Sequence, residues 1–260
     1  MISRLERFEV VDSTQSVVRG WLDAGVPEVA VAVANRQTAG RGRLERRWIA
    51  PPGAALLLSV GFRPADLPAG HGWRLAATVS LAMLDAAEEV AGLREGSLRL
   101  KWPNDLVAVE ASRDGSVRKV AGVLGEARLG SHGEVESAVI GIGMNVDWAE
   151  PDFPAELADT MSSLREIAHG RPVDRDALLD AFLSRVEPRY EALAVGRFDA
   201  SGWSTRQITT GRNVEVALGS QGLGGLGLGV DPEAGSLRLR LADGSERSID
   251  AGDVVRCSLA

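Results

Sequence analysis

The order of the expected elements predicts an α+β fold, in which a mixed and largely antiparallel sheet packs with helices. Helical and strand-like segments alternate at first, four adjacent strand-like segments follow over residues 97–146, and helical segments come next. From about residue 208 the chain changes to short strands between Gly and Asp turns, which predicts a small all-β barrel. We therefore expect two domains, 1–207 and 208–260.

The first helix is expected in "STQSVVRGWLDAG", with Ser13 or Thr14 as its cap and Gly25 after its end. Two strands should follow. "VAVAVANRQ", residues 29–37, carries small and β-branched side chains on both faces and so predicts a strand covered on both sides. "GAALLLSVGF", residues 53–62, is a second apolar strand.

The longest helical pattern is "GWRLAATVSLAMLDAAEEVAGL", which is rich in Ala and Leu and is closed by Gly92. The next four segments read as strands joined by short turns, with a hairpin signal in "SRDGS" at 112–116. These strands are "SLRLKW", "DLVAVE", "KVAGVLGEARL" and "EVESAVIGIGMNV". Helices are expected near 160–168 and at 174–194, where Asp174 is the cap, and residues 202–209 should lead out of the first domain.

Composition excludes several classes of protein. The chain has a net charge of −7, which argues against nucleic acid as the main partner. We find no apolar run long enough to cross a membrane and no secretory signal, and the single Cys257 fits a reducing cytoplasm. Three scattered histidines show no ligand spacing, which argues against a zinc site or a histidine-dependent triad.

One segment departs from the acidic total. From Arg36 to Trp48, a stretch that we call the basic loop, five arginines accompany a single Glu45. Gly40 and Gly42 separate the first arginines, and no helical or strand period runs through the segment. These features predict a mobile loop that meets a small anion. The alternative is a solvated loop that happens to be rich in arginine.

"KWPND", residues 101–105, combines a cation with a turn. Pro103 keeps the preceding residue extended, and Asn104 and Asp105 form a pair that favours a turn. The segment is either a polar turn between two strands or a site where Lys101, Asn104 and Asp105 surround a phosphate or a metal ion.

Three further motifs are weak on their own. Lys119 begins an apolar strand in which Gly122 lets backbone approach a ligand closely, although a lysine in this position is often only solvated. Asn145 ends the strand "GIGMNV", where it either reads a base edge or caps a turn. "GLGGLG", residues 222–227, matches a dinucleotide motif in letters, but turn and strand follow it instead of a helix, so we interpret it as a glycine-rich strand connection.

In their order along the chain, "DST", "QTAGRGR", Trp48, "KWPND", "KVAG" and "GIGMN" resemble the motifs of the biotin protein ligases. The resemblance runs from about Asp12 to Val146, and the C-terminal β region resembles the last domain of that family. It implies a class II synthetase-like catalytic fold with an SH3-like C-terminal barrel. Some members begin with a winged helix–turn–helix, and this chain resembles the non-repressor type that lacks it.

The resemblance implies a ligase that forms biotinyl-5′-AMP from biotin and ATP, with Mg²⁺, and transfers biotin to a lysine of a biotin carboxyl carrier protein. It implies no tightly bound prosthetic group, no nucleic acid partner and no membrane partner, and it leaves the oligomeric state open. Arg, Lys and Mg²⁺ would stabilise charge on the phosphate oxygens, and no side-chain nucleophile is required.

The resemblance also assigns roles to residues. The catalytic residues would be Arg41, Arg43, Lys101 and Lys119. Biotin would be bound by Ser13, Thr14, Gln15, Gln37, Gly40, Arg41, Gly42, Arg43, Lys119 and Gly122. ATP and the adenylate would be bound by Arg43, Trp48, Lys101, Asn104, Lys119 and Asn145, with Asp105 on the Mg²⁺ side.

Two positions depart from the family pattern. Many relatives have Asn where this chain has Gln15, and a second glycine is common where Leu44 and Glu45 follow "GRGR". We expect the second departure to stiffen the basic loop and to affect its rate of closure.

Two other functions stay open. A lipoate or octanoate ligase shares this fold and chemistry, but the "RR-x-x-GGG" stretch usual in those enzymes is absent from this sequence. A non-catalytic module that binds biotinyl-AMP or a carrier is the second alternative, against which the joint presence of the cationic residues argues.

Overall fold

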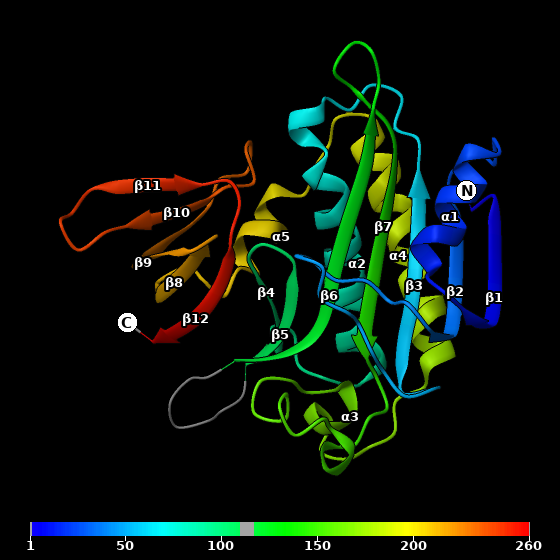
Figure 1. Ribbon diagram of the computed structural model, residues 1–260, viewed down its shortest axis with the longest axis horizontal. Helices are drawn as coiled ribbons and strands as arrows, with labels where there is room; N and C mark the ends of the chain where they lie inside the picture. Colours follow the sequence, from blue (N-terminus) through cyan, green and yellow to red (C-terminus); the bar gives the residue numbers. More distant parts are fainter. Residues whose placement is uncertain (1, 110–116, 260) are drawn as a thin grey trace.

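The computed structural model describes residues 2–109 and 117–259, which form two β-sheets and their helices (Figure 1). The larger sheet has seven strands in the order β1-β2-β3-β7-β6-β5-β4. Its strands are β1 (Arg4–Val11), β2 (Ala30–Gln37), β3 (Ala55–Phe62), β4 (Leu98–Lys101), β5 (Asp105–Val109), β6 (Val117–Leu129) and β7 (Val135–Asn145). Only the β1–β2 pair is parallel among the described ladders of this sheet, which confirms the predicted mixed, largely antiparallel arrangement.

The four strands expected within 97–146 pair in chain order as an antiparallel meander, β4 with β5, β5 with β6 and β6 with β7. The hairpin signal at 112–116 lies outside the described residues. Strand β1 was not predicted. It is the edge strand, and it carries four charged side chains among its eight residues without a regular alternation, as expected where one edge meets water.

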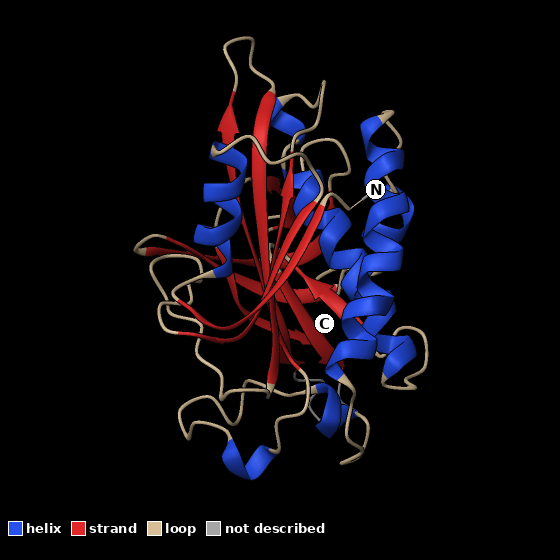
Figure 2. Ribbon diagram, turned by 90° about the vertical axis from the view of Figure 1, so that its right-hand side faces the viewer, coloured by secondary structure: helices blue, strands red, loops and turns tan. Residues whose placement is uncertain are grey.

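Helices cover both faces of the large sheet. On one face lies α1 (Thr14–Asp23), and on the other lie α2 (Trp73–Val90) and α4 (Arg175–Ala194), as the edge-on view of Figure 2 shows. Strand β3 is buried along its whole length because both of its faces are covered. Across the described residues, no helix is long and apolar enough to cross a membrane.

Of the later helices, α4 lies where the sequence predicts it, α3 is shorter than predicted, and α5 was not predicted. The predicted cap of α4 is confirmed, since the Asp174 carboxylate accepts from the amides of Asp176 at 2.8 Å and Ala177 at 3.1 Å. The helix expected near 160–168 is confined to the short α3 (Leu164–Ile167). The segment expected only to leave the domain contains a further helix, α5 (Ala200–Thr205).

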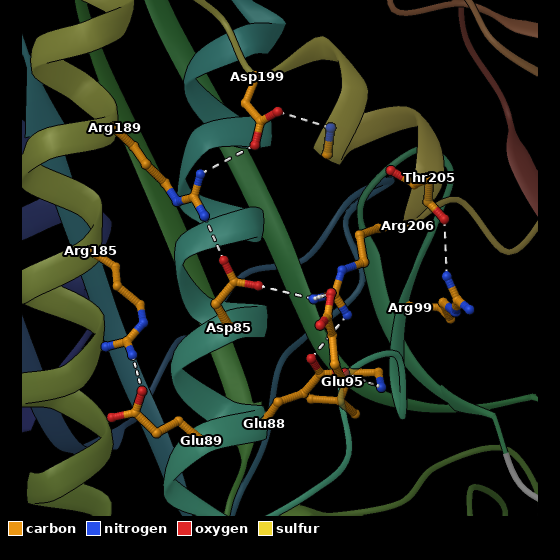
Figure 3. A network of polar contacts seen from close by, with 12 residues as sticks. Asp85, Glu88, Glu89, Glu95, Arg99, Arg185, Arg189, Asp199, Thr205 and Arg206 are labelled. Carbon is orange, nitrogen blue, oxygen red and sulfur yellow. Dashed lines mark hydrogen bonds and ion pairs between the residues drawn. The ribbon is translucent and has the colours of Figure 1, made fainter.

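A network of ion pairs joins α2, α4 and the end of α5 (Figure 3). Arg189 binds Asp85 at 2.5 Å and Asp199 at 3.4 Å, while Arg206 binds Asp85 at 3.2 Å and the buried Glu88 at 2.9 Å. A carboxylate in the interior requires such a partner. The Arg206 carbonyl also accepts from the amide of Leu100 at 2.9 Å, so the network fixes β4 one residue before Lys101.

The smaller sheet has five antiparallel strands in the order β11-β10-β9-β8-β12. They are β8 (Arg212–Leu218), β9 (Gln221–Val230), β10 (Leu237–Arg240), β11 (Glu246–Ile249) and β12 (Asp253–Leu259). The all-β prediction is confirmed, but within the described residues no ladder joins β11 to β12, so the structure shows a sheet where a barrel was expected. "GLGGLG" lies inside β9 and precedes no helix.

An aromatic contact attaches the smaller sheet to the larger one. The indole of Trp102 donates to the carbonyl of Gly235 at 2.9 Å. Gly235 has a φ of +72° and lies so close to Trp73 that an added Cβ would be 2.7 Å from that ring. A glycine is required here on both counts.

Candidate functional site

The basic loop lies between β2 and β3 and is folded back on itself. The amide of Trp48 donates to Gly40 at 3.0 Å, the amide of Gly42 donates to Arg46 at 2.7 Å, and Arg41 forms an isolated antiparallel bridge with Arg47. A Cβ on Gly40 would lie 2.4 Å from the Trp48 carbonyl oxygen. The first two residues, Arg36 and Gln37, belong to the end of β2, and from residue 38 onward the loop contains no named helix or strand, as predicted, although its two arms hold each other through backbone contacts.

The tip of the basic loop adopts a backbone conformation that favours glycine. Leu44 has a φ of 52° and Glu45 a φ of 60°, both in the left-handed region. These are the positions where the sequence departs from the glycine common in the family. The departure therefore falls where an L-residue is least suited to the backbone.

Three of the five arginines of the loop are paired with carboxylates from other parts of the chain. Arg41 lies 3.3 Å from Glu126 of β6. Arg43 lies 2.9 Å from Asp253 of β12, and Arg46 pairs with the same carboxylate. In this structure the negative charges nearest to the loop arginines are therefore the carboxylates of Glu126 and Asp253.

The indole of Trp48 lies on a floor of two glycines. Gly122 of β6 pairs with Gly143 of β7, and an added Cβ would lie 3.1 Å from Trp48 at Gly122 and 2.5 Å from it at Gly143. The Lys119 ammonium lies 5.6 Å from the centre of the indole ring, within reach of a cation–π contact. Side chains larger than hydrogen at either glycine would exclude a flat ring from this face of the sheet.

A pair of lysines shares one carboxylate beside this floor. Asp105 lies 2.6 Å from the Lys119 ammonium and 3.9 Å from that of Lys101, its partner across the β4–β5 turn. The resemblance to the biotin protein ligases predicted that Asp105 lies beside the Mg²⁺ that accompanies ATP. Two lysine partners disfavour a direct metal ligand, and within residues 2–109 and 117–259 no cluster of three His, Cys, Asp or Glu side chains is placed to bind a metal ion.

Asn104 connects the turn to the strand that carries the glycine floor. Its side-chain amide donates to the carbonyl of Val123 at 2.9 Å, and the Val123 amide donates back to the Asn104 carbonyl at 2.8 Å. Its side-chain oxygen accepts from Arg43 at 3.3 Å. The "KWPND" turn and the basic loop therefore meet at one residue.

A cluster of polar side chains forms where α1 begins. Ser13, Thr14 and Gln15 are all buried. The amide of Thr14 donates to the Gln37 side chain at 2.8 Å, and its hydroxyl lies 2.8 Å from that of Ser59. Buried polar groups held in this way keep a fixed pattern of donors and acceptors, which is what a polar ring of a ligand requires.

Gln15, which replaces the family's usual asparagine, reaches across to β6. Its side-chain amide donates to the Leu124 carbonyl at 3.0 Å, and its Cγ lies against Gly141 of β7, where an added Cβ would be 2.9 Å away. The longer side chain thus binds backbone on the floor of the site.

Asn145 is buried, and its side-chain amide donates to the Ser162 carbonyl at 2.9 Å. The amide of Ser162 donates in turn to the Lys119 carbonyl at 2.8 Å, and the Lys119 amide donates to Thr160 at 2.8 Å. The segment 160–162 therefore holds the backbone of Lys119 and the side chain of Asn145 together.

Of the predicted residues, Gly40, Arg41, Gly42 and Arg43 line an open cavity of about 630 Å³ between the basic loop and Leu124 and Glu126 of β6. Sequence reasoning missed Glu126, Gly143, Ser162 and Asp253. Gly143 lay within the quoted "GIGMN" motif and offered a signal, whereas the carboxylates and Ser162 offered none. A cationic pair, a loop of arginines, an aromatic ring and a cluster of buried polar side chains together suit a ligand with a flat ring and an anionic centre.

Comparisons with known proteins give a consistent result. A model of the Biotin/lipoate A/B protein ligase family matches residues 7–145. The biotin--[acetyl-CoA-carboxylase] ligase of Mycobacterium tuberculosis is 34% identical over 228 residues, which cover 86% of this chain and 78% of that protein. The bifunctional ligase/repressor BirA of Bacillus subtilis is 31% identical over 245 residues, covering 94% of this chain and 71% of that protein.

Among solved structures, a biotin protein ligase from Aquifex aeolicus in complex with biotin and ATP matches with a TM-score of 0.76 and 28% identity. The match covers 96% of each chain and so extends over both sheets.

Proposed function

Because the chain belongs to the biotin/lipoate A/B protein ligase family, we propose that it is an ATP-dependent biotin protein ligase. The observation that carries this proposal is the meeting of three motifs on one face of the sheet. Asn104 touches Arg43 of the basic loop, and its neighbour Asp105 lies 2.6 Å from the ammonium of Lys119. The Mycobacterium tuberculosis ligase, the Bacillus subtilis ligase/repressor and a structure bound to biotin and ATP are similar to this chain over most of its length.

In the first step, a carboxylate oxygen of biotin attacks the α-phosphorus of ATP and pyrophosphate leaves. The reactants and the transition state are anionic, so positioned cations lower the barrier by stabilising charge on the phosphate oxygens. Lys119 and Arg43 would lie on the carboxylate and α-phosphate, with Arg41 nearest the carboxylate and Lys101 on the triphosphate side.

In the second step, the amine of a carrier lysine attacks the carbonyl carbon of biotinyl-5′-AMP. AMP leaves with the bonding electron pair, and the proton of the attacking amine passes to solvent. The basic loop would exclude water from the anhydride until the carrier arrives.

The remaining residues would bind the two substrates. Ser13, Thr14, Gln15 and Gln37 would hold the polar ring of biotin, with Gly40, Gly42 and Gly122 letting backbone approach it. Trp48 would pack on adenine, while Asn145 and Asn104 would bind the adenylate. Each of these roles is inferred from the family motifs, and the burial of Ser13, Thr14, Gln15 and Asn145 supports those of the polar side chains.

We assign Mg²⁺ to the ATP substrate. It would arrive with the triphosphate, and Asp105 would orient Lys119 and Lys101 instead of binding a resident metal ion. We further propose that the carrier is a biotin carboxyl carrier domain, that the reaction is cytoplasmic, and that residues 1–207 and 208–260 are separate domains.

The test is transfer to a carrier. Incubation of the protein with biotin, MgATP and a biotin carboxyl carrier domain should attach biotin to the carrier's acceptor lysine, measured by intact mass. A carrier with that lysine changed to arginine is the control. Modification with lipoate in place of biotin would favour the lipoate ligase alternative, and no modification by either acid would favour the binding module.

A further inference from the structure

Glu126 is the carboxylate of β6 that faces the cavity beneath the basic loop. It lies on the same face of the strand as Gly122 and Leu124, because side chains of alternate residues point the same way and no bulge interrupts the β6–β7 register over this stretch. Four residues separate it from Gly122, or about 13 Å along the strand. It therefore marks the end of the site opposite to Lys119 and Asp105.

Two cations meet on this carboxylate. Arg41 of the basic loop lies 3.3 Å from one oxygen, and Arg19 of α1 pairs with the other. Arg19 follows Gln15 by four residues and so lies on the same side of the helix. Gln15 binds the Leu124 carbonyl just as Arg19 binds Glu126, so α1 is fastened to β6 at two successive positions of one face.

The first arm of the basic loop depends on this contact. Among the described ion pairs of the loop arginines, only that of Arg41 is to a carboxylate of the large sheet, since Arg43 and Arg46 form theirs with Asp253 of the small sheet. Arg41 also follows Gly40, whose carbonyl accepts from the Trp48 amide at 3.0 Å. A shift of Arg41 would therefore move the arm that passes the hydrogen-bonded pair of Thr14 and Gln37.

We propose that Glu126 is a positioning residue for biotin: by holding Arg41 it fixes the first arm of the basic loop over the biotin end of the site. The inference rests on the proposed function. It assigns to Glu126 an effect on biotin binding and on loop order, with little effect on ATP binding or on the chemical step.

The experiment is a double-mutant cycle in pyrophosphate exchange. Glu126→Gln should raise the KM for biotin about fivefold, the effect of one partly exposed ion pair, while kcat and the KM for ATP change less than twofold. In an Arg41→Gln background the same change should have no further effect. Arg19→Gln should leave the KM for biotin near that of the wild type, and Glu136→Gln, an exposed carboxylate on β7, controls for the lost charge.

Limited trypsin digestion supplies a readout that does not need activity. Glu126→Gln should speed cleavage at the arginines of the basic loop while the thermal midpoint of unfolding changes little. An unchanged or lowered KM for biotin, a fall in kcat alone, or the same effect in the Arg41→Gln background would overturn the inference. A wild-type protein that shows no exchange would refute the proposed function instead, and the trypsin comparison would still decide the role of Glu126 in ordering the loop.

Discussion

Arg43 of the basic loop and Asp253 of the C-terminal sheet lie 2.9 Å apart, although 210 positions separate them in the chain. The same guanidinium donates to the Gly252 carbonyl at 3.2 Å and to the Asn104 side chain at 3.3 Å. The small sheet thus reaches the loop that we place over the adenylate. This gives the C-terminal region a direct part in the site.

Loss of this contact should weaken ATP binding. We expect Asp253→Asn to raise the KM for ATP roughly three- to tenfold, because Arg43 and Arg46 lose a carboxylate that is largely shielded from water. Steady-state exchange at varied ATP measures it. Asp250→Asn, an exposed carboxylate in the preceding turn, is the matched control, and equal KM values for both variants would contradict the account.

A methyl group on the glycine floor should displace Trp48. Gly143→Ala would place a Cβ 2.5 Å from the indole, and we expect it to lower the free energy of unfolding by about 1–3 kcal/mol and to reduce adenylation. Urea unfolding and pyrophosphate exchange measure the two effects. The double variant with Trp48→Ala should recover much of the lost stability, because the clashing ring is then gone.

The control for this prediction lies in the other glycine-rich segment. At Gly222 an added Cβ would meet nothing closer than Glu215 at 3.7 Å. Gly222→Ala should leave ATP binding intact and change stability by less than about 0.5 kcal/mol. A large loss of ATP binding would restore the nucleotide-binding interpretation of "GLGGLG".

The sequence predicts those parts of the structure that depend on contacts between residues close together in the chain. The meander within 97–146 and the Asp174 cap follow from local patterns, since turns and caps use residues that are adjacent in the chain. Strand β1 was missed because an edge strand carries charges that hide its period.

The site shows the same division. The position of "KWPND" in the turn between two strands could be predicted, because its residues are adjacent in the chain; the binding roles of Lys101 and Asn104 remain predictions. Glu126 and Asp253 could not be predicted, because their partners are set by tertiary packing and no local pattern distinguishes them from other carboxylates.

Replacing Leu44, whose backbone is left-handed, by glycine should not lower the free energy of unfolding. Leu44 is exposed and has a φ of 52°, so Leu44→Gly should change the free energy of unfolding by zero to about +1 kcal/mol, a balance of relieved strain against chain entropy. Val195→Gly, at an exposed position with a φ of −105°, should instead lose about 0.5–1 kcal/mol. Equal losses in both variants by urea unfolding would contradict strain at Leu44.

Cys257 should react slowly in the folded protein. Burial raises the pKa of its thiol above the ordinary 9.0, an effect that the nearby charges of Arg212 and Lys101 only partly offset. At pH 8, iodoacetamide should label the native protein at least about tenfold more slowly than the urea-unfolded chain. Similar rates in both states would contradict the burial of this thiol.

The same shift in pKa predicts a dependence of stability on pH. Because the folded thiol keeps its proton longer than the unfolded one, its contribution to the free energy of unfolding is complete below pH 9 and falls as the pH rises above it. The free energy of unfolding is measured from pH 8 to 10 for the wild type and for Cys257→Ala. The difference between the two slopes against pH gives the contribution of the thiol. An identical slope would show that the thiol does not titrate differently on folding.

The most direct test of the central claim is exchange of labelled pyrophosphate into ATP with biotin, lipoate or octanoate supplied in parallel. We expect exchange with biotin alone, and Lys119→Met should reduce it at least about a hundredfold, because a cation is then missing from the developing phosphate charge. Exchange with lipoate or octanoate instead, or no exchange by a folded wild-type protein with any of the three acids, would contradict the assignment as a biotin protein ligase.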